Sequence, residues 1–188
     1  MATRDAEGTR RRILAAATED FARHGIAGAR VDRIAARAEV SKAQIYAYFG
    51  DKLALFAAVF RRHAAVVVDA TPFTATELPG YAVGLYDAAL DRPDIIRLMA
   101  WARLEDVAPP LDDAAVAGKL QAIADAQVQG AVRVDVSPED VLALVTSIAL
   151  TWSVVGLSPV QPAGSPADHD RRRAVLRHVI EHSLTIQE

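Results

Sequence analysis

The sequence predicts an all-α protein of about nine helices. Apolar residues recur at helical spacing along most of the chain, and no segment shows the sustained apolar-polar alternation of a strand. Prolines, glycines and serine-proline pairs divide this pattern into pieces of helix length. Helices are expected at about residues 7–24, 31–38, from 41, from 51, 77–91, 93–107, 112–130, 138–157 and 167–186.

The first expected helix has a well-defined apolar face. Ile13, Leu14, Ala17 and Phe21 fall on one stripe, which is typical of a helix packed on a core. Gly25 follows as the expected C-cap, because glycine adopts the left-handed backbone that ends many helices.

Two short helices follow and are joined by residues 39–41, which predicts a helix-turn-helix. Ser41 is expected to cap the second of them, with Gln44 reaching back in a capping box. The second short helix would then be the recognition helix of a DNA-binding domain. The residues expected to face inward on the flanking helices are Ile34, Ala35, Leu53, Phe56, Ala57 and Phe60.

The later helices have clear start and stop signals in the sequence. Ser137 and Pro138, followed by two acids, form the strongest start signal in the chain. The stretch 141–167 holds no charged residue, but its apolar part is only about 17 residues long and hydroxyl side chains interrupt it. We therefore expect a helix buried on several sides within a protein core and no membrane span.

Composition narrows the class of protein. The chain has 188 residues, 52% of them hydrophobic, and no cysteine, which excludes a disulfide framework, thiolate metal ligands and a cysteine nucleophile. The charged first segment lacks the apolar run of a secretory signal, so a cytoplasmic location is expected.

Charge is distributed unevenly along the chain. Residues 1–62 carry a net charge of +5, whereas residues 63–188 carry −8. A basic N-terminal third joined to an acidic remainder is expected when only that third approaches DNA, although solvated surface charge can vary in this way without function.

The geometry of the recognition helix assigns its side chains. At about 100° per residue, Ile45 and Phe49 must face the core, which leaves Ala43, Gln44 and Ala47 pointing away from it. Alanines allow close approach to the groove floor and can touch thymine methyl groups, while a glutamine amide suits the adenine edge.

Tyr46 and Tyr48 fall on opposite flanks of this helix, where their hydroxyl groups can reach phosphates. Lys42 and Lys52, near helix starts, can add salt-dependent phosphate contacts. Alternatively, the two tyrosines are ordinary core or subunit-packing residues.

This region resembles the DNA-binding domain of the TetR (tetracycline-repressor) family over about residues 8–60. The resemblance implies that Lys42, Gln44 and Tyr46 contact the operator and that Tyr48 and Lys52 hold phosphates. It also implies a dimeric, ligand-responsive regulator. The residues that carry it are Ile34, Ala35, Ala38, Val40, Ser41, Tyr46, Tyr48, Phe49, Lys52 and Leu53.

Three positions depart from the family pattern. Glu39 and Ala43 stand where glycine is usual, and Ala29-Arg30-Val31 replaces the usual threonine before the second helix. Glu39 should turn outward or pair with an arginine such as Arg37. Arg30 is expected to supply a phosphate contact in place of the missing hydroxyl group.

Arg10, Arg11 and Arg12 form a second basic cluster at the start of the first helix. In the family this end lies near the DNA backbone, so some of the three are expected to hold phosphates. The alternative is a solvated helix face.

The later helices are expected to bind a small-molecule effector and to form a homodimer through the last two helices, as a four-helix bundle. The apolar seam of the last helix consists of Val175, Leu176, Val179, Ile180 and Leu184. The candidate effector-binding residues, each of which could equally be plain core, are Tyr81, Leu85, Tyr86, Met99, Trp101, Arg103 and Trp152.

One enzyme-like motif competes with this interpretation. His178, Glu181 and His182 have HxxEH spacing, which is typical of inverted zinc proteases. No third ligand follows and the same helix carries the apolar seam, so we expect no metal, no cofactor and no catalytic residue.

The sequence therefore predicts a DNA-binding domain over residues 1–52 and a ligand-binding and dimerisation domain over 53–188. The expected function is a transcriptional repressor that binds a near-palindromic double-stranded operator. A helical enzyme or ligand carrier, or an interaction bundle that binds no DNA, are the alternatives.

Overall fold

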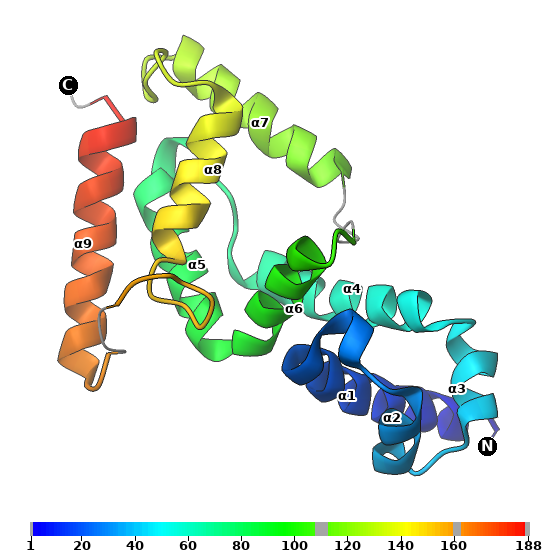
Figure 1. Ribbon diagram of the computed structural model, residues 1–188. Coiled ribbons are helices and arrows are strands. Elements are labelled where there is room, and N and C mark those ends of the chain that lie inside the picture. The colour runs from blue at the N-terminus through cyan, green and yellow to red at the C-terminus, as the bar shows by residue number, and fades with distance from the viewer. Residues whose placement is uncertain (1, 108–112, 160–162, 187–188) are drawn as a thin grey trace. The chain divides into compact units, whose positions relative to one another are not determined.

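The computed structural model describes residues 2–107, 113–159 and 163–186, and these form nine α-helices and one short 3-10 helix (Figure 1). The described residues contain no strand, only an isolated bridge between Val132 and Thr185. The prediction of an all-α fold is confirmed. The elements are α1 (Ala2–Gly28), α2 (Val31–Ala38), α3 (Lys42–Phe49), α4 (Lys52–Ala70), η1 (Ala75–Glu77), α5 (Leu78–Asp91), α6 (Pro93–Leu104), α7 (Asp113–Val128), α8 (Pro138–Ala149) and α9 (Pro166–Leu184).

Residue contacts divide the chain into two compact units. Unit 1 comprises Met1–Val66 and Asp94–Pro110, and unit 2 comprises Val67–Pro93 and Leu111–Glu188. Helix α4 therefore crosses from one unit into the other, and α6 groups with the N-terminal helices although its sequence neighbours belong to unit 2. The functional boundary at residues 52–53 stays a prediction.

The core of unit 1 is built from the stripe expected on α1. Ile13, Leu14, Ala17 and Phe21 are all buried. The ring of Phe21 meets that of Phe56 on α4 edge to face, with ring centroids 5.4 Å apart. This packing fixes how α1 and α4 lie against each other inside the unit.

Of the residues expected to face inward on α4, Leu53 was predicted wrongly and Ala57 is only half-buried. Leu53 is 54% exposed, whereas Leu55 and Val59 are buried together with Phe56 and Phe60. The inward stripe of the helix runs through positions 55, 56, 59 and 60, so Leu53, at its second residue, is turned away from the core.

A buried carboxylate joins α1 to α2. Asp20 accepts hydrogen bonds from Arg33 Nε at 2.7 Å and from the backbone N–H of Arg30 at 2.9 Å. Burial pushes the pKa of Asp20 upward, but these hydrogen bonds and the charge of Arg33 outweigh it and leave the pKa below its ordinary value. The charged carboxylate thus holds the start of α2 against α1.

Helix α6 packs on the end of α1. Gly25 interrupts α1 with a positive φ of 75°, as the C-cap prediction required, and a short helical segment continues to Gly28. The indole N–H of Trp101 donates to the carbonyl of Ala22 at 3.2 Å. The carboxylate of Glu105, directly after α6, accepts from the backbone N–H of Ile26, so one side chain of α6 and one just beyond it hold this interruption in place.

Unit 2 packs α5 against α8 and α9, while η1 and α7 complete its core. Helix α8 starts as predicted, with the hydroxyl of Ser137 accepting from the backbone N–H of Asp140 at 3.1 Å. Arg173 on α9 donates to the carboxylate of Asp87 on α5 at 2.9 Å. The buried apolar residues of α9 are Leu176, Ile180 and Leu184.

The predicted helix over residues 138–157 is too long. Helix α8 ends at Ala149, and the backbone then turns through bonds such as Ser153 N–H to the Leu150 carbonyl at 3.0 Å. A side chain at Gly156 would collide with the backbone of Thr151, so this tight return needs glycine. Within the described residues, no helix has both the length and the apolar character needed to cross a bilayer.

Candidate nucleic-acid interface

The turn between α2 and α3 is built by local capping. Glu39 ends α2 in the left-handed conformation, with φ 55° and ψ 47°. Ser41 then caps α3, its hydroxyl accepting from the backbone N–H of Gln44 at 3.1 Å, while Gln44 Oε1 accepts from the backbone N–H of Ser41 at 2.9 Å. The predicted capping box is confirmed and fixes the start of the expected recognition helix.

Helix α3 presents the face that its sequence predicts. Ile45 is 1% exposed and anchors the helix to the core of unit 1. Ala43, Gln44 and Ala47 are all exposed, on the side expected to meet the groove floor. A polar and alanine-lined face of this kind can approach base edges without a bulky side chain intervening.

The two tyrosines flank this face. Tyr46 is 47% exposed and Tyr48 is 38% exposed, so neither ring belongs to the core of the single chain. Tyr48 lies against Phe49, with ring centroids 6.2 Å apart and planes tilted by 41°. Neither hydroxyl group has a hydrogen-bond partner within the described part of the chain, so both can meet a phosphate on either side of the exposed face.

The amide of Gln44 takes part in the capping box and is also the group predicted to read a base. Its oxygen is engaged in the capping box, which leaves the NH₂ group as the part best placed to meet a base. An adenine N7 accepts from such a donor, whereas a full bidentate contact with adenine would use the oxygen as well. The predicted base contact would therefore share this side chain with the capping box.

The two lysines expected at the DNA are both held by unit 1. Lys42 Nζ lies 2.6 Å from the carboxylate of Asp32, a pair in which both side chains are at least half exposed. That ion pair raises the pKa of Lys42 and keeps it cationic. Lys52 Nζ donates to the carbonyls of Ala27 and Ala29 at 3.1 and 3.4 Å. A surface ion pair such as that of Lys42 with Asp32 contributes little to the free energy of folding, so a DNA phosphate can replace the Asp32 carboxylate.

The departures from the family pattern have structural answers. Glu39 is exposed and turns outward, while Arg37 instead pairs with Glu19. Arg30 is exposed at the N-cap of α2, and its side chain makes no cap hydrogen bond there. Its guanidinium is accessible to an external anion.

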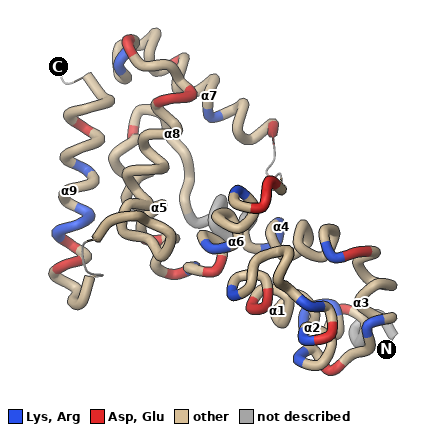
Figure 2. Tube along the Cα trace, viewed as in Figure 1, with Lys and Arg blue, Asp and Glu red and all other residues tan. Residues whose placement is uncertain are grey.

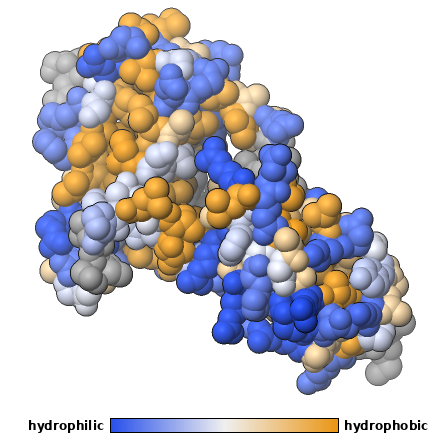
Figure 3. All heavy atoms as spheres, viewed as in Figure 1, coloured by the Kyte–Doolittle hydropathy of each residue, from blue (hydrophilic) through white to orange (hydrophobic). Residues whose placement is uncertain are grey.

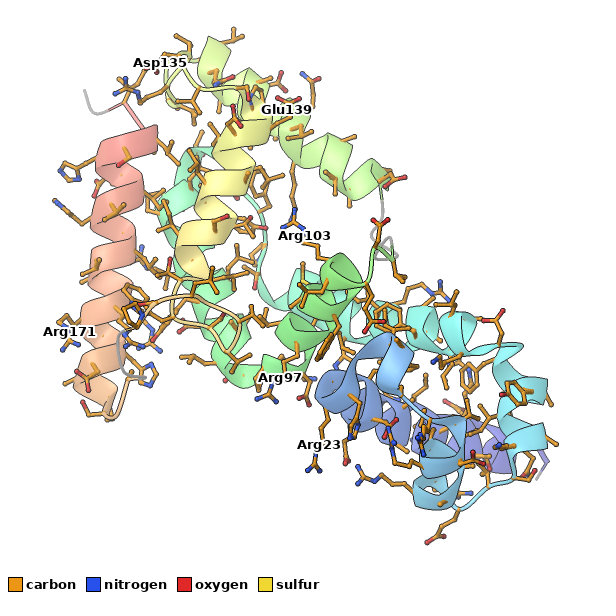
Figure 4. All side chains as sticks on the ribbon, viewed as in Figure 1. Arg23, Arg97, Arg103, Asp135, Glu139 and Arg171 are labelled. Carbon is orange, nitrogen blue, oxygen red and sulfur yellow. The ribbon has the colours of Figure 1, made fainter. Side chains whose placement is uncertain are left out.

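The three arginines of the basic cluster on α1 have different surroundings. Arg12 Nε donates to the carbonyl of Ala38 at 3.2 Å, which ties α1 to the end of α2. Arg10 lies over the ring of Phe49 at 5.5 Å. Arg11 is exposed, and along α1 the side chain of Arg23 also points outward (Figure 4).

The candidate effector residues fall in different units. Tyr81, Leu85, Tyr86 and Trp152 belong to unit 2, whereas Met99, Trp101 and Arg103 belong to unit 1. The structure brings Tyr86 and Trp152 together, with ring centroids 6.0 Å apart. Trp101 packs on α1, and Arg103 is exposed and projects away from α6 (Figure 4). Their role in binding an effector stays a prediction.

Three polar residues beside these aromatics were missed by the sequence analysis. Lys119 Nζ donates to the Tyr81 hydroxyl at 2.8 Å, and His169 Nδ1 lies 2.7 Å from the Tyr86 hydroxyl. The buried guanidinium of Arg172 lies over the Trp152 ring at 5.0 Å. Each partner is distant in sequence, so no local pattern signals the pairing.

The HxxEH motif forms a local arrangement on α9. The rings of His178 and His182 lie 4.1 Å apart, and His182 Nδ1 is 2.8 Å from the carbonyl of His178. Among the residues that the structure describes, no group of three or more histidine, cysteine, aspartate or glutamate side chains is arranged to hold a metal ion.

Comparison with known proteins agrees with this geometry. Residues 13–59 match the family described as bacterial regulatory proteins, tetR family, and residues 77–182 match the family described as tetracyclin repressor-like, C-terminal domain. The chain is 38% identical over 160 residues to the HTH-type transcriptional repressor SCO4008 of Streptomyces coelicolor. The aligned residues make up 82% of this chain and 83% of that protein.

Solved structures show the same fold. A putative transcriptional regulator, SCO4942 from Streptomyces coelicolor, is 45% identical, with a TM-score of 0.79 over 94% of this chain and 98% of that one. A TetR family transcription regulator from Marinobacter aquaeolei VT8 shares the fold over the full length of both chains, with a TM-score of 0.69 at 18% identity. The chain belongs to the TetR family of DNA-binding transcriptional regulators, which are not enzymes.

Proposed function

We propose that this protein is a cytoplasmic repressor that binds a near-palindromic operator as a homodimer and is released by a small hydrophobic or aromatic effector. The observation that carries the proposal is the exposed face of α3, formed by Ala43, Gln44 and Ala47 and flanked by Tyr46 and Tyr48. This face offers one amide, two hydroxyl groups and little steric bulk. The name of the 38% identical relative, a transcriptional repressor, supports the same direction of regulation.

A second copy of the chain would explain the apolar surface of unit 2. Leu144 and Val175 are each 44% exposed on α8 and α9, and Leu157 beyond α8 is fully exposed. Hydrophobic side chains of unit 2 reach the surface in Figure 3, and α8 carries charge only in its first turn (Figure 2). A second chain that buried these residues would complete the predicted four-helix bundle.

The dimer explains the expected operator. Each chain has one recognition helix, and two such helices related by a two-fold axis enter successive major grooves about 34 Å apart. A near-palindromic site presents the same bases to both helices.

An effector would act by favouring one of two conformations. Helix α4 continues from unit 1 into unit 2, and α6 joins unit 1 between two helices of unit 2, so both link the two units covalently. The aromatic pair Tyr86 and Trp152 marks the part of unit 2 where we place a planar apolar ligand. Only a ligand with unequal affinity for the two conformations can release DNA.

The test is fluorescence-anisotropy titration and footprinting on the DNA upstream of the gene, at several salt concentrations. Gln44→Glu retains the capping box but loses the amide donor, whereas Gln44→Ala loses both. Both variants are expected to lose base preference, and only Gln44→Ala should also lose stability. Gln121→Ala, an exposed glutamine on α7, is the control that should leave binding unchanged.

Tyr48→Phe removes one hydroxyl group at the flank of α3 and is expected to weaken binding to all sequences alike. Protection of a near-palindrome, with base preference lost in both Gln44 variants, supports the proposal. Equal affinity for the upstream DNA and for random DNA at every salt concentration contradicts it.

A further inference from the structure

A hollow lies between α1 and α4, entirely inside unit 1. Its volume is about 300 Å³, close to the lower end of the range for small-molecule sites. Two helices that are distant in sequence supply its walls. We call it the arginine pocket, and its lining residues are Glu7, Arg10, Arg11, Leu14, Ala58, Arg61 and Arg62.

The arginine pocket concentrates positive charge. Arg10 and Arg11 enter from α1, and Arg61 and Arg62 enter from α4, against the single carboxylate of Glu7. All four arginines are exposed, and none forms an ion pair with a carboxylate of the residues that the structure describes. Four guanidinium groups around one hollow repel one another, and a bound anion would relieve that repulsion.

Other arginines of unit 1 are arranged differently. Arg33 is bonded to the carboxylate of Asp20, and Arg37 is paired with Glu19. The guanidinium groups of these two arginines are therefore engaged in ion pairs within the chain. Among the residues that the structure describes, those of the arginine pocket have no such acidic partner, which leaves their donors available to a ligand.

The floor of the arginine pocket is apolar. Leu14 is 2% exposed and Ala58 is 8% exposed, so both form a closed surface beneath the charged rim. Arg10 also lies over the ring of Phe49, the last residue of α3, at 5.5 Å. The site therefore combines anion donors, an apolar base and a neighbour in the proposed recognition helix.

We propose that the arginine pocket binds a small organic phosphate. The guanidinium fork matches phosphate oxygens in bidentate geometry, and several forks suit a group with more than one negative charge. Leu14 and Ala58 would contact the uncharged part of the ligand. A site of this volume exceeds the needs of a single phosphate and fits a phosphorylated metabolite.

The phosphate could also come from the DNA backbone, because Arg10 and Arg11 belong to the cluster that the family resemblance places near DNA, and the salt slope on DNA measured below separates the two sources. For Arg61 and Arg62, the length of α4 argues against the DNA backbone. Lys52 opens α4 at the end expected to meet the operator, and Arg61 and Arg62 follow nine and ten residues later. At 1.5 Å per residue they lie about 14 Å further along the helix axis. Any effect of the ligand on DNA affinity rests on the proposed function, whereas binding to the arginine pocket does not.

The experiment is isothermal titration calorimetry of the full chain, without DNA, using inorganic pyrophosphate and, separately, ATP free of divalent metal. The double variant Arg61→Ala with Arg62→Ala removes two walls of the pocket. The matched control is Arg23→Ala with Arg97→Ala, which removes the same charge from exposed arginines of unit 1 outside the pocket (Figure 4). Arg61→Lys with Arg62→Lys keeps the charge but loses the fork, and a thermal melt verifies the fold of each variant.

We expect both anions to bind one per chain, with ATP tighter because of the apolar floor. Affinity should fall about tenfold or more in the alanine double variant, less in the lysine variant and not in the control. Equal weakening in the control would show diffuse charge attraction and overturn the proposal. Absence of binding by either anion would also overturn it, and a reduced salt slope on DNA in the same variant would then assign these arginines to the DNA backbone.

Discussion

The carboxylate of Glu105, the residue that follows α6, accepts a hydrogen bond of 2.9 Å from the backbone N–H of Ile26, just beyond the interruption of α1. Its second oxygen accepts from the backbone N–H of Ala27 at 2.6 Å. A single side chain thus caps the short helical segment 26–28 from 78 residues away in the chain. The end of α1, which leads directly into α2, depends on α6 for its geometry.

Glu105→Ala should lower the free energy of unfolding by about 1–2 kcal/mol, because two backbone N–H groups lose their acceptor. Chemical denaturation measures the loss, and amide exchange at Ile26 and Ala27 should quicken. Glu181→Ala, an exposed acid on α9, is the control expected to change neither. Unchanged exchange at both amides would contradict the capping role.

Gly25→Ala should cost about 2 kcal/mol or more. Its φ of 75° is unfavourable for alanine, and the added methyl group would overlap the Glu105 carboxylate and lie 2.9 Å from Trp101 Cε3. Gly118→Ala within α7 meets nothing within 4 Å and is expected to stabilise the protein by about 0.5–1 kcal/mol. Thermal melts should therefore show a lower melting temperature for Gly25→Ala and a higher one for Gly118→Ala than for the parent protein.

Glu39→Gly should stabilise the protein by about 1 kcal/mol, because residue 39 ends α2 in the left-handed region. Glu39→Ala removes the same charge but retains the backbone strain, so its stability should stay near that of the parent. Both variants remove a negative charge from the turn that precedes the proposed recognition helix, so both should bind the operator more tightly and to a similar degree. An equal rise of the melting temperature in both variants would show that the charge of Glu39, and not its backbone conformation, lowers the stability of the protein.

Acid should loosen the attachment of α2 through Asp20. The pKa of Asp20 is lower in the folded chain than in the unfolded chain, so its contribution to stability is complete above the unfolded value of about 3.9 and is lost as the pH falls from there through the lower pKa of the folded chain. Asp20→Asn should lower stability at neutral pH by about 2 kcal/mol and flatten the acid limb of the stability curve. The control is Asp91→Asn, at the exposed end of α5, which should keep the parent's acid dependence.

Leu144→Glu combined with Val175→Glu should shift the protein from dimer to monomer, because charge would replace apolar side chains on α8 and α9. Sedimentation velocity over a range of concentrations measures the change. Val128→Glu is the matched control, since Val128 is 89% exposed at the end of α7, outside the last two helices. Monomer in the unsubstituted protein at every concentration would exclude the proposed dimer.

Features that depend on local geometry could be predicted from the sequence. The capping box of Ser41 and Gln44 spans three residues, and the inward position of Ile45 follows from the helical repeat alone. The end of α8 could not be predicted, because residues 150–157 remain apolar after the helix stops. The spacing of apolar residues reflects composition and does not show where the backbone leaves the helix. Glu105, Arg61 and Arg62 were missed for another reason, since their roles arise where segments distant in sequence meet, and Arg10 and Arg11 were predicted only as possible contacts of the DNA backbone.

The hydrogen bond between Gln44 and Ser41 also bears on the entropy of DNA recognition. A glutamine on an open helix face samples many rotamers, and immobilising such a side chain at an interface costs about 0.5–1.5 kcal/mol. Here folding has already restricted the side chain before any DNA arrives. Reading a base with its free NH₂ group would then require little additional ordering, so discrimination between operators could come from hydrogen-bond geometry and not from the stiffening of a loose side chain.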